Sequence, residues 1–415
     1  MKTTGIIAEF NPFHNGHLHL LDYCRKELAS DHIVIVMSGD FVQRGTPAMV
    51  DKFVRTKMAL ECGADLVLEL PVCYSTGSAE YFASGAVSIL DKLGCVDQLV
   101  FGSECGDTAL LTQIAQILAK EPSQYKETLA SYIKQGDSFP VARQKALISY
   151  LSDADGFSMD EALLKSVLSS PNNILGIEYI KAILTRGSSI TPVTIKRIGE
   201  GYNSTEITPL SSASGIRSAI ADNDLSFDDL GKAMPAPSLS LLKENAGRMA
   251  DIKRFSDLVY YKLLLEKDNG YTKYLDVTED LSNKIASNLE KYQDFDQFCS
   301  LLKSKDIAYS RICRCLTHIV LGITSAAMDE YKANNYTSFV RVLGMKADSS
   351  VLLRPIGDSE GSSALTNIKN AAKELTTAEY SQFKETLFAT EIYNSICPVK
   401  NANEYRLKQI IYSFT

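Results

Sequence analysis

Two histidines three residues apart lie near the start of the chain: His14 and His17, with Gly16 between them. They follow a short apolar run that breaks at Asn11-Pro12, a pattern typical of a strand end because proline cannot donate to a strand ladder. The sequence therefore predicts a strand, a turn and a helix whose positive end lies beside the histidines. Imidazoles and free N–H groups at a helix start bind phosphate, and Gly16 would let a ligand approach the backbone closely.

Chemistry at the α-phosphorus of a nucleotide needs donors that stabilise a highly charged transition state, and His14 and His17 are suited to that task. Of the five histidines in the chain, these two and His19 fall within six positions. The alternative is two unrelated histidines in a loop. We expect no metal bound by side chains here, because no carboxylate or third ligand has a zinc-like spacing.

A second motif, residues 212–217, is typical of a hydroxyl-rich helix start with an arginine in its first turns. A guanidinium group binds phosphate oxygens through forked, charge-assisted hydrogen bonds. The resemblance given next implies that Arg217 holds departing phosphates, with Ser214 beside it. The motif is similar to the Ser-Ser-Thr-x-Ile-Arg motif of the nucleotidylyltransferases, with Ala213 at its second position and Ser214 for threonine. The histidine turn resembles the histidine signature of the same superfamily.

Composition limits the class of protein. The 415 residues are enough for two or three domains, and 45% hydrophobic with 22% charged residues is typical of a globular protein. The net charge of −7 disfavours RNA binding over the whole surface but leaves room for a local basic face. Nine scattered cysteines, no stretch of transmembrane length and no signal-peptide pattern predict a cytoplasmic protein with reduced thiols and no membrane partner.

Strands alternate with helices over roughly the first 200 residues, which predicts a parallel, helix-covered sheet. We expect an α/β, Rossmann-like, ATP-binding catalytic domain over residues 1–225 and a mostly α-helical domain over residues 226–415. The expected strands are residues 6–10, 32–37, 65–70, 98–101 and 190–196. The expected helices of the first domain include residues 17–30, 52–62, 80–93, 108–119 and 125–136.

Polar loops follow several of these strands, where open α/β sheets bind ligands. The loop 38–45 contains Asp40, Gln43 and Arg44, which either bind substrate or order the loop. The loop 102–104 would admit an adenine or ribose, or would only satisfy its own amides. Asn172 and Asn173 open a predicted helix, where one of them would cap the helix and the other could bind a ligand. Arg197, directly after the last predicted strand, is a further ligand candidate because of its positive charge.

Four ordered motifs, residues 11–17, 37–45, 171–179 and 193–199, together resemble the bacterial tRNA(Met) cytidine acetate ligases. The resemblance continues at residues 310–314 and 339–344, in the part of the chain expected to be helical. It implies that ATP and acetate form acetyl-adenylate and that the acetyl group passes to N4 of the wobble cytidine of elongator tRNA(Met), giving N4-acetylcytidine. Magnesium would accompany ATP, and the helical domain would bind the tRNA. The sequence leaves the oligomeric state open.

The resemblance also implies site residues. The catalytic residues would be His14, His17 and Arg217. The ATP-binding residues would be Ile7, Ala8, Glu9, Phe10, Asn11, Pro12, Phe13, His14, Asn15, Gly16, His17, Leu18, His19, Leu20, Gly102, Asn172, Arg197, Ile198 and Ser214. The cations predicted to contact tRNA are Arg311, Arg314 and Arg341; the first two lie three residues apart on one helical face.

Two other functions remain open at this point. A small-molecule adenylyltransferase of cofactor biosynthesis would use the same histidine turn, but it would not need the second domain. A non-catalytic module that senses nucleotide or binds RNA would not need His14, His17 and Arg217, which are all present.

Overall fold

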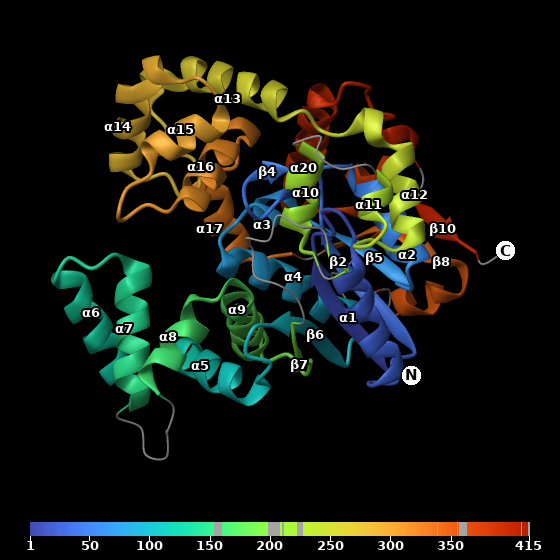
Figure 1. Ribbon diagram of the computed structural model, residues 1–415, viewed down its shortest axis with the longest axis horizontal. Helices are drawn as coiled ribbons and strands as arrows, with labels where there is room; N and C mark the ends of the chain where they lie inside the picture. The colour runs from blue at the N-terminus through green and yellow to red at the C-terminus, as the bar shows by residue number, and fades with distance from the viewer. Residues whose placement is uncertain are drawn as a thin grey trace. The chain divides into compact units, whose positions relative to one another are not determined.

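The computed structural model describes residues 1–152, 160–197, 208–209, 211–221, 227–337, 339–354, 356, 363–407 and 409–413 (Figure 1). The chain divides into two compact units, one made of residues 1–97 and 198–415 and the other of residues 98–197. We call them unit 1 and unit 2 and describe each by itself.

Unit 1 is built on a mixed sheet in the order β10-β8-β5-β2-β1. Strands β1 (Thr3–Ala8), β2 (His32–Ser38) and β5 (Leu66–Leu70) are parallel, and β8 (Phe339–Lys346) joins β5 in the antiparallel sense. The short strands β9 (Ser363–Leu365) and β10 (Ile410–Tyr412) pair with β8. Every residue of β5 and β8 is buried, including the charged Glu69 and Arg341, which pair with each other.

Helices cover this sheet and extend beyond it (Figure 1). A two-stranded hairpin, β3 (Phe41–Val42) and β4 (Thr46–Pro47), follows β2. The α-helices of unit 1 are α1 (Asn15–Lys26), α2 (Lys52–Glu61), α3 (Val72–Ser75), α4 (Ala79–Leu93), α10 (Ala213–Ala221), α11 (Phe227–Leu230), α12 (Ala236–Glu244), α13 (Ile252–Glu266), α14 (Glu279–Asn288), α15 (Phe295–Leu302), α16 (Tyr309–Leu321), α17 (Ser325–Ala333), α19 (Ala371–Glu374) and α20 (Thr377–Ile396).

Unit 2 has two parallel strands and five α-helices among its described residues. Strand β6 (Gln98–Ser103) pairs with β7 (Thr191–Lys196) along its whole length, so that Ser103 lies opposite Lys196. The helices are α5 (Thr108–Lys120), α6 (Ser123–Lys134), α7 (Phe139–Ser152), α8 (Glu161–Ser169) and α9 (Pro171–Arg186).

The mostly parallel sheet and its helices confirm the α/β class and the five predicted strands, with ends shifted by a few residues. The division of the chain differs from the predicted boundary at residue 225. Residues 226–415 do not form a separate domain, because β8 and β10 complete the sheet that β1, β2 and β5 begin. Residues 98–197 instead form their own unit.

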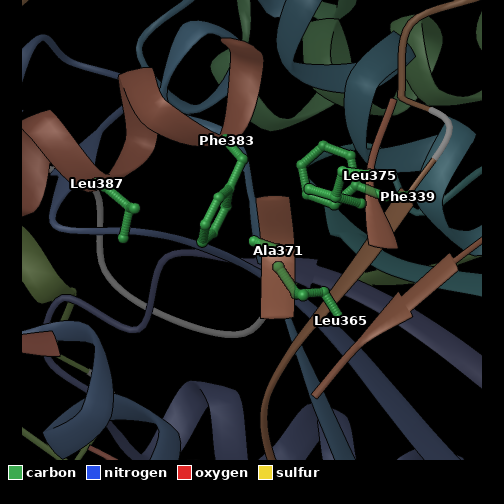
Figure 2. Packing of buried hydrophobic residues seen from close by; sticks show 6 residues of the cluster. All are labelled: Phe339, Leu365, Ala371, Leu375, Phe383 and Leu387. Carbon is green, nitrogen blue, oxygen red and sulfur yellow. The ribbon is translucent and has the colours of Figure 1, made fainter. Parts of the chain in front are cut away.

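The C-terminal segment packs on the sheet through one apolar cluster (Figure 2). Phe339 of β8 and Leu365 of β9 meet Leu375, Phe383 and Leu387, which come from α20 and the residues before it. Phe339 and Phe383 contact edge to face, with ring centroids 6.2 Å apart. Residues 339–344, expected in the helical part, are therefore a buried strand. A short apolar run does not by itself distinguish strand from helix.

Candidate active site

The histidine turn begins helix α1, as predicted, and His14 is its N-cap. Nδ1 of His14 accepts the N–H of Gly16 at 3.0 Å, and Nδ1 of His17 accepts the N–H of His14 at 3.2 Å. The two imidazoles lie against each other with centroids 3.8 Å apart and planes inclined by 32°. Since both Nδ1 atoms are acceptors, the proton of each neutral ring belongs on Nε2. Each of the two contacting rings thus carries its N–H donor on Nε2.

The backbone N–H groups of this turn are less available than the sequence predicts. Asn15 N–H donates to the carbonyl of Ala233 at 2.8 Å, and His17 N–H donates to that of His14 at 2.9 Å. Gly16 N–H is already bonded to the His14 ring. A Cβ at Gly16 would lie 2.8 Å from Cε1 of His14, so this glycine makes room for the imidazole. These backbone N–H groups are therefore already bonded, and we expect a phosphate to meet imidazole N–H groups rather than helix amides.

Aromatic rings hold the His17 imidazole. Its centroid lies 4.9 Å from that of Phe10 and 5.4 Å from that of Phe13, and these two phenyl rings are 1% and 0% exposed. Phe10 has a φ of +49°, a left-handed conformation that is strained for a bulky residue. This backbone ends β1 at Ala8, two residues earlier than predicted, and turns the chain toward the histidines.

Arg217, from helix α10, reaches the histidine turn. Its Nη1 donates to the backbone carbonyl of Asn11 at 2.6 Å, and its Nη2 lies 3.5 Å from Oγ of Ser214. The Asn15 side chain ties the start of α1 to the same region, donating to the carbonyls of Pro209 at 3.1 Å and Lys232 at 2.8 Å. Two motifs some 200 residues apart in the chain are thus joined by hydrogen bonds.

The loop after β2 is a structural support for this turn. Gln43 N–H donates to Oε1 of Glu9 at 2.8 Å, and Asp40 accepts the N–H of Lys52 at 2.9 Å. Arg55 is fully buried and donates to the carbonyls of Glu9 and Gly39. For Asp40 and Gln43 these bonds favour ordering of the loop, while Arg44 is exposed. No sequence motif marks Arg55.

Unit 2 contains its own polar cluster at the carboxyl ends of β6 and β7. The Glu104 carboxylate accepts three hydrogen bonds from the start of α9: from Asn172 N–H, from Asn172 Nδ2 at 2.7 Å and from Asn173 N–H at 2.8 Å. The N-cap is Ser170, so neither asparagine is the predicted cap. Cγ of Arg197 lies 3.0 Å from where a Cβ at Gly102 would be.

The two asparagines of this cluster differ in availability. Asn173 is 1% exposed and bonds to Cys105 and Val167, which leaves it no free surface. Asn172 is partly exposed, and its Oδ1 lies 3.5 Å from Nη1 of Arg197. Asn172 is thus the better ligand candidate of the pair. Ile198 lies outside the described residues.

Among the other predicted ATP-binding residues, Asn11, Pro12 and Ile7 are buried, as are both phenylalanines, so their side chains form the floor of the turn. Ala8, Glu9, Leu18 and Leu20 are partly exposed, and His19 is exposed on α1.

The arginines predicted to bind tRNA differ in placement. Arg341 is 4% exposed on β8 and forms ion pairs with Glu69 and Glu404, so the structure corrects this prediction: Arg341 has no surface to offer RNA. Arg311 and Arg314 lie on α16 and are partly exposed. Arg311 donates to the carbonyl of Asp276 at 3.2 Å, and burial lowers the pKa of Arg314.

Two findings concern the described residues as a whole. They contain no group of three or more His, Cys, Asp or Glu side chains arranged to hold a metal ion. None of their helices combines the length and the hydropathy needed to cross a membrane.

A histidine turn at the carboxyl end of a strand, met by an arginine from a later helix, is the arrangement of a nucleotidyltransferase. The chain belongs to that class: it matches the family described as HIGH Nucleotidyl Transferase over residues 1–409. Within it, the tRNA(Met) cytidine acetate ligase of Clostridium perfringens is 39% identical over 417 residues, covering 99% of this chain and 100% of the relative. That of Clostridium kluyveri is 41% identical over 399 residues, 95% of each chain. The chain is therefore a member of the tRNA(Met) cytidine acetate ligase family.

Solved structures agree with this assignment over the full length of the chain. The crystal structure of Thermotoga maritima TmcAL bound with alpha-thio ATP matches with a TM-score of 0.91 and 30% identity, covering 100% of both chains. The apo structure of the same Thermotoga maritima protein matches with a TM-score of 0.93 and 31% identity, also over 100% of both.

Proposed function

We propose that this protein activates acetate with ATP and transfers the acetyl group to N4 of the wobble cytidine of elongator tRNA(Met). The observation that carries the first half is the 2.6 Å hydrogen bond from Arg217 to the Asn11 carbonyl, which holds a guanidinium on the backbone that leads into the two contacting imidazoles. The second half is supported by the family, whose relatives are named tRNA(Met) cytidine acetate ligases.

In the first step an acetate oxygen attacks the α-phosphorus of ATP, and the bond from that phosphorus to the bridging oxygen breaks to release pyrophosphate. Nε2–H of His14 and of His17 would donate to the α-phosphate oxygens as charge builds on them. Arg217 and Ser214 would hold the departing pyrophosphate. No side-chain nucleophile is required, because acetate itself forms the new bond.

In the second step the cytosine N4 attacks the acetyl carbonyl carbon, AMP leaves, and N4 loses one proton. The acceptor base must be unstacked from the anticodon loop to reach the mixed anhydride. We assign Arg311 and Arg314 to contacts with the RNA backbone, because they are the predicted pair that remains partly exposed. Arg341 is not part of this proposal.

Within unit 2, Gly102, Asn172 and Arg197 are the residues that we propose as nucleotide-binding. Arg197 and Asn172 form an exposed polar pair, and Arg197 lies beside Gly102, which has no side chain to fill the space next to it. Magnesium would enter with the triphosphate, because the described residues include no carboxylate cluster that could hold it independently. It would neutralise phosphate charge.

The test is the complete reaction with purified protein. ATP, acetate and a transcript of elongator tRNA(Met) are incubated together, and the RNA is digested and analysed for N4-acetylcytidine. We expect the product only when all three substrates are present, and we expect a transcript with uridine at the wobble position to remain unmodified. Acetate-dependent exchange of labelled pyrophosphate into ATP reports the first step alone.

A small-molecule adenylyltransferase would give a different result. Its pyrophosphate exchange would respond to a nucleotide or pantetheine compound rather than to acetate, and no acetylated nucleoside would form. That outcome would overturn the proposed function while leaving the assignment of the histidine turn intact.

A further inference from the structure

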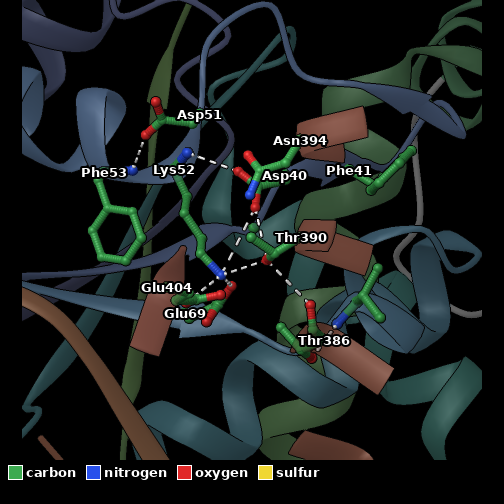
Figure 3. Close-up of polar contacts among 12 residues, drawn as sticks. Asp40, Phe41, Asp51, Lys52, Phe53, Glu69, Thr386, Thr390, Asn394 and Glu404 are labelled. Carbon is green, nitrogen blue, oxygen red and sulfur yellow. Dashed lines mark hydrogen bonds and ion pairs between the residues drawn. The ribbon is translucent and has the colours of Figure 1, made fainter. Parts of the chain in front are cut away.

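A cavity of about 280 Å³ in unit 1 is not used by the proposed reaction. Its floor consists of buried polar side chains, including Asp40, Thr390 and Glu404, which are 4%, 6% and 2% exposed. Figure 3 shows these residues around the end of the Lys52 side chain. Asp40 follows β2, and the cavity therefore lies at the carboxyl edge of the sheet, where α/β proteins bind ligands.

Charged side chains are packed beneath this floor. Lys52 Nζ lies 2.8 Å from Oε1 of Glu69 and 2.8 Å from Oε1 of Glu404, and 3.8 Å from Oδ2 of Asp40. Arg341 pairs with Glu69 and Glu404 from the other side. Three buried carboxylates thus lie around two cations, burial raises the pKa of Glu69, and the buried Arg55 donates to the carbonyl of Gly39, next to Asp40. A positive group is favoured over a negative one beside buried carboxylates.

Two residues that line the cavity each carry a buried acceptor atom with no hydrogen-bond donor among the described residues: Oε2 of Glu404 and Oδ1 of Asn401. Burial favours the neutral form of Glu404, but Arg341 and Lys52 outweigh it and lower its pKa to about 2. The carboxylate is therefore charged, with one oxygen unused. A buried acceptor left without a donor costs more than the average hydrogen bond contributes, which points to a ligand that supplies N–H groups.

The chemistry of the lining excludes several occupants. Acetate, ATP and RNA phosphates are anions and would be repelled by the floor. The described residues provide no set of three metal ligands. The walls include Phe53, Leu241 and Ile410, which favour an aliphatic stem behind a cationic head.

We propose that this cavity binds a small organic cation, a primary ammonium on a short aliphatic stem, whose N–H groups donate to Oε2 of Glu404 and Oδ1 of Asn401. Glu244 and Arg248 also line the cavity, at its exposed side, where they meet the far end of the stem. The site is independent of the proposed acetate ligase reaction, and its test uses no ATP, acetate or tRNA.

The experiment is calorimetric titration of the full-length protein with butylammonium, putrescine and γ-aminobutyrate, and with butanol as the uncharged probe. We expect saturable binding of the ammonium compounds with a dissociation constant at or below about 1 mM, and none of butanol. If putrescine binds more tightly than butylammonium, the far end of the ligand stem carries a second ammonium group that meets Glu244. Tighter γ-aminobutyrate binding assigns it to a carboxylate at Arg248. Either result supports the site.

Variants locate the binding. Glu404→Gln removes the charge and should weaken butylammonium binding about 10-fold or more. Because this change also disturbs Lys52 and Arg341, Ala402→Trp is the second variant: Ala402 lines the cavity from an exposed position, and a large ring there should abolish binding in a folded protein. The matched control Glu391→Gln removes an exposed carboxylate of α20 that does not line the cavity, and it should bind normally.

Three results would overturn the proposal. The first is the absence of saturable binding by any of the ammonium probes. The second is unchanged butylammonium affinity in Ala402→Trp. The third is competition for the site by a cytidine oligonucleotide, which would make it an RNA pocket.

Discussion

The imidazole of His17 lies 3.8 Å from that of His14, centroid to centroid, and each ring accepts a backbone N–H through Nδ1. The pair is therefore one unit. His14 caps the helix, and His17 in turn fixes the backbone of His14. Both rings are held in the tautomer that places a proton on Nε2, where a phosphate oxygen would accept it.

Removal of one member of this pair should slow the first half-reaction. We expect His17→Ala to lower acetate-dependent pyrophosphate exchange by about 10²-fold or more, the scale of a lost charge-stabilising donor. The matched control is His32→Ala, because His32 lies at the amino end of β2, the opposite edge of the sheet. Near-normal exchange in His17→Ala would contradict the assigned role.

Gly16→Ala tests the geometry of the pair without removing either ring. The new Cβ would lie 2.8 Å from Cε1 of His14, so the imidazole must move. We expect pyrophosphate exchange to fall by about 10-fold or more, since small misplacements of catalytic groups are costly. Gly247→Ala is the control, because no heavy atom lies within 4 Å of its added Cβ. Full activity of Gly16→Ala would show that the ring position is not important.

How much of this site the sequence predicts depends on whether a residue acts through local spacing. His14, His17 and Arg217 were found because their motifs are short and continuous. The capping bond of His14 and the buried donor Arg55 were missed, because both depend on backbone geometry that no motif specifies. For the loop 102–104 the sequence leaves open ligand contact or a turn that satisfies its own amides, and in the structure Glu104 of this loop binds the first turn of α9.

The errors in the fold have the same origin. The sequence predicts a helical domain around residues 339–344 because their partner strand β5 begins about 270 residues earlier, and pairing over that distance leaves no local pattern. The wrong prediction that Arg341 contacts tRNA has the same cause. On an exposed helix the Arg341 side chain would face solvent, whereas on a central strand it is buried and must be paired with a carboxylate.

Arg311 and Arg314 can be tested apart from the chemistry. The double variant Arg311→Gln/Arg314→Gln keeps much of each aliphatic stem and removes two charges. We expect pyrophosphate exchange to persist, tRNA affinity to fall about 10-fold, and the salt dependence of binding to become shallower by about one counterion per lost phosphate contact.

The control for this variant is Lys303→Ala/Lys305→Ala, which removes the same charge from an exposed loop. Equal loss of tRNA affinity in the control would mean that only net charge matters. If pyrophosphate exchange and acetyl transfer to tRNA fell equally in the arginine variant, the result would contradict a role of Arg311 and Arg314 in RNA binding alone.

We expect Glu385 to make the free energy of unfolding depend on pH. Burial raises the pKa of this carboxyl from 4.5 to about 7, although Tyr331 donates to Oε1 at 2.9 Å. Because the pKa of Glu385 is higher in the folded state than in the unfolded state, the folded state prefers the neutral carboxyl. The stability that this preference contributes is fully present below pH 4.5 and is lost as the pH rises toward 7. Glu385→Gln stays neutral, so at about pH 8 it should unfold with a free energy higher by on the order of 2 kcal/mol, and at about pH 4 the difference should vanish.

Urea unfolding at the two pH values measures this difference. Glu391→Gln, an exposed carboxylate on the same helix, should change stability little at either pH. A constant difference between Glu385→Gln and the unmodified protein across the range would contradict the raised pKa.

We expect Arg341 to stabilise the folded state and not to contribute to RNA binding. Its replacement by alanine leaves Glu69 and Glu404 buried with only Lys52 to share, so we expect the free energy of unfolding to fall by about 3–5 kcal/mol. Arg354→Ala, at an exposed position, should change it by less than about 0.5 kcal/mol. Denaturant unfolding measures both, and tRNA binding is then measured under conditions where the variant is folded. The folded Arg341→Ala protein should bind tRNA normally, whereas unchanged stability with weakened tRNA binding would restore the arginine to the RNA surface.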